Sequence, residues 1–165
     1  MNVVLLFQKS KTNKKLWLTW ALFPALFALT VLFLPVTRDA DAMLGKFPPF
    51  EQKMSININR GSYLIGVFNL SCEHCQETAR ELAVLQKSGI QLPQVVALFF
   101  DEGDTTVEAF NALTDSQFPY QRIEANTFFD LIGSAPPRVY WIKDGTINQF
   151  WDNDITAGIK ATFVP

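Results

Sequence analysis

The stretch that decides the fold is Tyr63–Cys75, which reads YLIGVFNLSCEHC. Its first part, Tyr63–Leu70, is a nearly continuous apolar run, typical of a strand that is buried on both faces. From Glu73 to Lys87 the pattern becomes helical, with apolar residues on one side and charged residues on the other. Cys72 and Cys75 therefore fall where a buried strand gives way to a helix.

This position matters more for the chemistry of the two cysteines than their spacing alone. A thiolate is the nucleophile in disulfide exchange, and the first turn of a helix offers unpaired N–H groups and the positive end of the helix dipole. Both favour a thiolate at Cys72, which we expect to be the exposed attacking thiol. Cys75, one turn deeper, would be the resolving thiol. A bridge closing so short a loop adds little stability, so we expect the pair to cycle.

His74 lies between the two cysteines and is the only histidine of the chain. A protonated imidazole would stabilise the Cys72 thiolate and make the disulfide more oxidising. Glu73 acts in the opposite direction, because a carboxylate beside a thiolate disfavours the charged sulfur. The sequence does not decide between these effects, and it equally allows His74 to be a solvated residue of the first turn.

A metal site is the alternative interpretation of this segment. Two cysteines and one histidine supply three ligands, whereas a structural zinc site needs four. No further cysteine or histidine occurs in the chain. We therefore expect no metal and no cofactor.

The rest of the chain predicts an α/β domain. A βαβ unit followed by a hairpin, with Asp144-Gly145 as its turn, indicates a mixed sheet flanked by helices. Met54–Asn59 alternates in polarity and predicts an edge strand. Ile155–Pro165 leaves room for a short final helix at most. The other expected elements are strands at Val95–Phe100, Val139–Ile142 and Thr146–Trp151, a short extended piece at Tyr120–Ile123, and helices at Asp104–Leu113 and Asn126–Ile132.

This order of elements resembles the thioredoxin superfamily. The segment SAPPRV at residues 134–139 matches the family's cis-proline loop. The resemblance implies that this loop faces the cysteines and binds the extended backbone of a substrate. By its distance from the hairpin turn, Pro137 best matches the cis residue, and Pro136 is the alternative. An ordinary turn that enters the strand is the other interpretation of the two prolines.

A narrower resemblance covers residues 68–152. They look like the periplasmic thioredoxin-like tail of bacterial DoxX-type membrane proteins, with SCEHC and SAPPRVYWIKDG as the most specific segments. Those proteins carry several membrane spans ahead of the redox domain, whereas this chain shows one.

Two positions depart from the thioredoxin pattern. Ser71 stands where thioredoxins have tryptophan, and Gly66 stands where they have a buried carboxylate that moves the proton of the resolving thiol. That role is then vacant or passes to Asp101 or Glu102 at the end of the next strand. The alternative is that both acidic residues are solvated.

The N-terminal part predicts a membrane anchor. The run from Leu16 to Leu34 has no charged residue and, as a helix, reaches roughly 28 Å, the thickness of a bilayer core. Four lysines and no acidic residue precede it, which indicates a cytoplasmic N-terminus and a translocated C-terminal domain. The segment Ala40-Asp41-Ala42 would fit signal-peptide cleavage, but the apolar run exceeds a usual signal core.

We therefore expect a basic cytoplasmic N-terminus at 1–15, a transmembrane anchor at 16–35, a linker at 36–53 and a thioredoxin-like domain at 54–165. From residue 36 onward the formal net charge is near −6, which argues against nucleic-acid binding. The predicted function is a membrane-anchored periplasmic thiol–disulfide oxidoreductase that exchanges disulfides with protein partners. The alternatives are a copper-handling protein of the same fold and a redox-inactive interaction module of a membrane complex.

Overall fold

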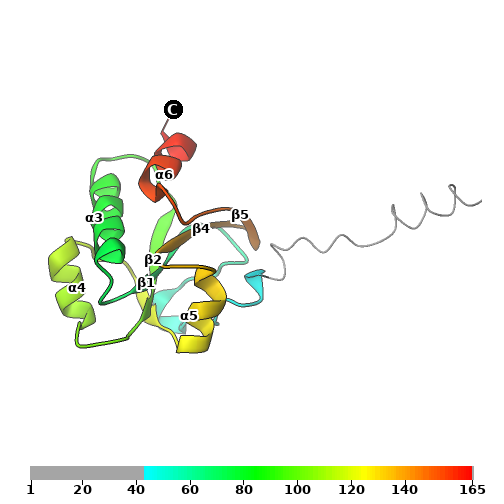
Figure 1. The fold of residues 1–165 in the computed structure, drawn as a ribbon. Helices are drawn as coiled ribbons and strands as arrows, with labels where there is room; N and C mark the ends of the chain where they lie inside the picture. Colours follow the sequence, from blue (N-terminus) through cyan, green and yellow to red (C-terminus); the bar gives the residue numbers. More distant parts are fainter. Residues whose placement is uncertain (1–42, 165) are drawn as a thin grey trace, which may run out of the picture. The chain divides into compact units, whose positions relative to one another are not determined.

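The computed structural model describes residues 43–164, and Figure 1 shows their fold. Within this range no helix is long and apolar enough to cross a membrane. The predicted anchor at 16–35 and the basic segment at 1–15 lie outside the described residues.

A five-stranded mixed sheet forms the centre, with strand order β3-β2-β1-β4-β5. The central strand β1 (Ser62–Asn69) pairs in parallel with β2 (Gln94–Phe100) and antiparallel with β4 (Arg138–Lys143). Beyond β2 lies the short parallel strand β3 (Tyr120–Arg122), and β5 (Thr146–Trp151) forms a hairpin with β4. The predicted α/β domain with a mixed sheet is confirmed.

Helices cover both faces of this sheet (Figure 1). One face is covered by α3 (Glu73–Lys87), α4 (Val107–Thr114) and α6 (Ile155–Phe163), whose apolar residues share one core with the sheet. The other face is covered by α5 (Ala125–Ile132). The α3 bounds are those predicted from the sequence. The α4 helix begins three residues later than predicted because the Thr106 hydroxyl caps it by accepting the Ala109 N–H.

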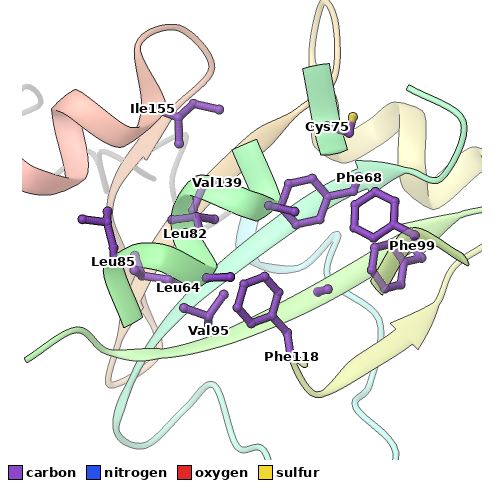
Figure 2. Close-up of a cluster of buried hydrophobic side chains, with 14 of the residues drawn as sticks. Leu64, Phe68, Cys75, Leu82, Leu85, Val95, Phe99, Phe118, Val139 and Ile155 are labelled. Atoms are coloured by element: carbon purple, nitrogen blue, oxygen red, sulfur yellow. The ribbon is translucent and has the colours of Figure 1, made fainter. Parts of the chain in front are cut away.

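Aromatic rings fill much of the core under α3 and α4. Phe68 of β1 packs against Phe99 of β2 and Phe110 of α4, with ring centroids 6.1 Å apart in both pairs. All three side chains are buried. Figure 2 shows Cys75 at the end of this cluster, above Phe68. The resolving cysteine of the predicted redox pair is therefore a member of the hydrophobic core.

The core under α5 is covered by the helix and by a segment that precedes β1. Besides Phe128 and Leu131 of that helix, it includes Phe47, whose ring packs edge-on against Tyr140 of β4 at a centroid distance of 5.1 Å. Phe47 comes from the segment predicted as a linker. Residues on both sides of it, among them Phe50, pack against the same core.

The edge strand predicted at Met54–Asn59 is wrong. A 3-10 helix at Gln52–Met54 is followed by Ser55 in the left-handed conformation, with φ of 53°. The Asn57 side chain then accepts the Asn59 N–H at 3.0 Å. Such local hydrogen bonds compete with strand pairing, because they satisfy the backbone within a turn.

Candidate redox site at the carboxyl edge of the sheet

Three loops meet at one edge of the sheet because of its topology. The parallel strands β1 and β2 end there, and the antiparallel β4 begins there, with Val67 paired to Arg138. The C-x-x-C segment follows β1, an acidic loop follows β2, and the Pro136-Pro137 segment precedes β4. The sequence therefore brings all of its predicted site segments to the same edge.

Cys72 is the N-cap residue of α3. Its backbone is extended, and its Sγ accepts the N–H of Cys75 at 3.2 Å. The side chain is partly exposed. One of the N–H groups at the start of the helix therefore donates to the Cys72 sulfur. This agrees with the prediction from the position of Cys72 between a strand and a helix.

Cys75 has a different environment although it lies one turn away. Its side chain is fully buried, and this burial raises the pKa of the Cys75 thiol well above its ordinary value of 9.0. A hydrogen bond with Cys72 raises the pKa further. The N–H of Asn69, which donates to the Cys75 Sγ at 3.5 Å, acts in the opposite direction.

Asn69, the last residue of β1, is a site residue that the sequence analysis missed. Its side-chain oxygen accepts the Ser71 N–H at 2.9 Å, and its side-chain nitrogen donates to Glu102 at 3.0 Å. Its carbonyl oxygen accepts the Cys72 N–H at 3.2 Å. An asparagine side chain often accepts the backbone N–H two residues later and so forms a turn. An asparagine at the end of a predicted strand, two residues before Ser71, is therefore a sequence signal that could have identified Asn69.

The loop after β2 is joined to the cysteine loop at a second point. The Ser71 hydroxyl lies 3.2 Å from the Thr105 hydroxyl, to which it donates. Between them Gly103 has φ of 135°, and a β-carbon there would lie 2.8 Å from the Ser71 oxygen. Any other residue would be strained at this φ and would displace the Ser71 hydroxyl.

The place of the thioredoxin carboxylate is occupied in this chain. A β-carbon at Gly66 would overlap the Phe68 ring, so no larger side chain fits there without a shift. Of the two proposed substitutes, Asp101 pairs with Arg122 at 3.4 Å, and Glu102 accepts the Asn69 amide. Both acidic side chains are exposed.

His74 lies on the outer side of α3. Its side chain is 64% exposed, and its Nδ1 is 3.8 Å from the Glu77 carboxylate. The carboxylate therefore competes with the Cys72 sulfur for any positive charge on the imidazole. Within residues 43–164, no three Cys, His, Asp or Glu side chains gather as a potential metal site.

The proline loop contains the cis peptide bond that the resemblance implies. The peptide bond between Pro136 and Pro137 is cis, so Pro137 is the cis residue, as its spacing from the hairpin turn predicted. The next residue, Arg138, is buried and donates to Asp152 at 2.7 Å while its guanidinium lies 4.7 Å from the Phe150 ring centroid. This ion pair ties the start of β4 to the end of β5, and the sequence analysis did not predict it.

A solved structure shows which fold this arrangement belongs to. A secreted disulfide oxidoreductase of Mycobacterium tuberculosis, described as homologous to E. coli DsbE, superimposes with a TM-score of 0.51 over 69% of this chain and 87% of that chain, at 15% identity. The fold is thioredoxin-like. A thiol:disulfide interchange protein from Bacteroides sp. gives a TM-score of 0.46 at 10% identity, covering 64% of this chain and 75% of that chain.

The sequence comparisons are more limited. No family model matches the chain. Protein TlpB of Flavobacterium psychrophilum is 27% identical over 106 residues, which is 63% of this chain and 29% of the relative. The chain thus spans less than a third of the length of this curated relative. What the structural comparison shows is the thioredoxin-like fold.

Proposed function

We propose that this thioredoxin-like domain exchanges disulfides with protein partners through Cys72 and Cys75. Cys72 attacks a partner disulfide or receives a partner thiol, and Cys75 resolves the mixed disulfide. Pro136 and Pro137 would hold the extended backbone of the partner beside the cysteines.

The observation that carries this proposal is the unequal environment of the two sulfurs. Cys72 is partly exposed and accepts a helix N–H, whereas Cys75 is buried one turn away. An exposed attacking thiol and a protected resolving thiol are what a two-step exchange requires, because the second step must wait for the mixed disulfide. A purely structural pair would need no such difference.

The test is a redox titration with glutathione, followed by mass spectrometry of single-cysteine variants. The wild-type protein should show one two-electron transition. The Cys75→Ser variant should accumulate one glutathione on Cys72, and the Cys72→Ser variant should accumulate little. Ser71→Ala, which retains both thiols, is the matched control. Equal glutathionylation of both single-cysteine variants would contradict the assigned roles.

We further propose that the domain is held in the periplasm by a retained single-span anchor at residues 16–35. The four lysines ahead of an uncharged run support this orientation, and the Mycobacterium tuberculosis protein of similar fold is described as secreted. Protease added to intact spheroplasts should degrade the domain. Full protection until lysis would contradict the orientation, and recovery of the domain in the soluble periplasmic fraction would contradict the anchor.

A further inference from the structure

We propose that Asn69 is a positioning residue for the resolving step and that Glu102 holds it in place. The inference rests on the proposed function at Cys72 and Cys75. In the resolving step Cys75 gives its proton to solvent, and its sulfur attacks the Cys72 sulfur of the mixed disulfide. The Cys72–Cys75 bond forms, the bond from Cys72 to the partner breaks, and the partner sulfur leaves as a thiolate and takes up a proton.

The difficulty of this step lies in ionising a buried thiol. Cys75 is fully buried at the end of the aromatic cluster that contains Phe68, and burial disfavours its thiolate. In thioredoxins a buried carboxylate assists, but here the Phe68 ring fills the space beside Gly66. The hydrogen bond from the Asn69 N–H to the Cys75 Sγ is the interaction that favours the thiolate.

The Asn69 side chain fixes the direction of this N–H. Its oxygen accepts the Ser71 N–H and its nitrogen donates to the Glu102 carboxylate, so the side chain is held at both ends. The Asn69 carbonyl oxygen also accepts the Cys72 N–H. These bonds fix the chain from the end of β1 to the start of α3, and the N–H on Cys75 is fixed with it.

Glu102 anchors Asn69 to a different loop. The carboxylate accepts the amide at 3.0 Å from the segment after β2, which also contacts the cysteine loop through Ser71 and Thr105. A glutamine at position 102 would retain an acceptor oxygen without the charge, whereas an alanine would retain neither. The two substitutions therefore separate a hydrogen-bonding role of Glu102 from a role as proton acceptor.

The experiment follows the reaction of the reduced full-length protein with 5,5′-dithiobis(2-nitrobenzoate) by stopped flow. The first release of thionitrobenzoate reports attack by Cys72, and the second reports resolution by Cys75. Asn69→Ala should slow the second release about fivefold to tenfold at neutral pH, because a hydrogen bond to the thiolate is weakened. It should also move the pH midpoint of that release upward, while the first release changes less than twofold.

The Glu102 variants complete the test. Glu102→Gln should resolve at the wild-type rate, Glu102→Ala should be slower, and Asp104→Ala in the same loop is the matched control. An unchanged second release in Asn69→Ala would overturn the inference, as would equal slowing of both releases without a shift of the pH midpoint. If Glu102→Gln is as slow as Glu102→Ala, Glu102 does not act by holding the Asn69 side chain. Its carboxylate would then act as the acceptor of the Cys75 proton. Absence of a second release in the wild type would instead contradict the proposed function.

Discussion

One helical turn separates two regions that differ in almost every physical respect. The lip of the site, from Ser71 to His74, is polar and largely exposed, and its bonds run to a neighbouring loop. The pocket of Cys75 is buried against the aromatic core, and burial raises the pKa of the Cys75 thiol. The helix start donates the Cys75 N–H to the Cys72 sulfur, because the first N–H groups of a helix have no partner within it, whereas the N–H on the Cys75 sulfur comes from Asn69 at the end of β1.

The difference teaches where the selectivity between the two sulfurs arises. The helix start donates an N–H to the Cys72 sulfur. The larger difference between the two sulfurs comes from the residues of the sheet that surround Cys75. Phe68 on one side and the Asn69 N–H on another define the Cys75 environment. Changes on the buried side should therefore have larger effects than changes at the lip.

The largest expected effect is on thiol reactivity. In Cys75→Ser, Cys72 should react with iodoacetamide at least about a hundredfold faster at pH 7.5 than Cys75 does in Cys72→Ser, since burial disfavours the reactive thiolate. The measurement is the alkylation rate of each folded single-cysteine variant against pH. Superimposable profiles would remove the contrast and leave the redox-inactive interaction module as the better interpretation. Unfolded variants in denaturant, which should react equally, are the control.

The next effect concerns the packing beside the buried sulfur. Gly66→Ala should lower the free energy of unfolding by about 1–3 kcal/mol, because the new methyl group overlaps the Phe68 ring. Chemical denaturation measures this loss. Phe68→Leu should relieve the overlap, so the double variant should be more stable than the sum of the single losses predicts. Strict additivity would show that the two positions do not compete for one space.

A smaller effect should appear in the pH dependence of stability. Because burial raises the folded pKa of Cys75, the unfolded chain releases this proton first as the pH rises through 9.0. The contribution of Cys75 is fully present below that pH. Above it the reduced protein should lose about 1.4 kcal/mol per pH unit. The difference from Cys75→Ala isolates the effect, because other groups titrate in both proteins. Parallel curves above pH 9 would refute it.

Much of the site could be predicted from the sequence because its signals are local. The strand-to-helix switch places Cys72 at a helix start, and the spacing from the hairpin turn identifies Pro137 as the cis residue. Neither inference needs knowledge of a contact between distant residues. The helix after the cysteines was predicted with its observed bounds for the same reason, since its apolar period is unbroken.

The features that could not be predicted from the sequence depend on contacts between residues far apart in the chain. Asn69 and Glu102 are 33 residues apart, and they meet because β1 and β2 end side by side. The Arg138–Asp152 pair likewise needs the register of the hairpin. At Met54–Asn59 the polarity pattern fitted a strand, but left-handed Ser55 shows that local turn geometry prevailed over alternation.

The smallest expected effect is at the centre of the motif. His74→Asn should change the Cys72 alkylation rate in the Cys75→Ser background by less than about twofold, because the charge of an exposed imidazole is screened by solvent. Its nearest ionic partner is Glu77, at 3.8 Å, so part of any positive charge is already neutralised there. The double variant His74→Asn/Glu77→Gln separates the two groups: it should react at nearly the same rate as His74→Asn. Measurement at low and high salt completes the design, since a screened interaction should strengthen as the salt is removed. A tenfold loss of reactivity in His74→Asn, insensitive to salt, would mean that the imidazole contacts the Cys72 sulfur. A change at the lip would then have a larger effect than the comparison of the lip with the Cys75 pocket predicts.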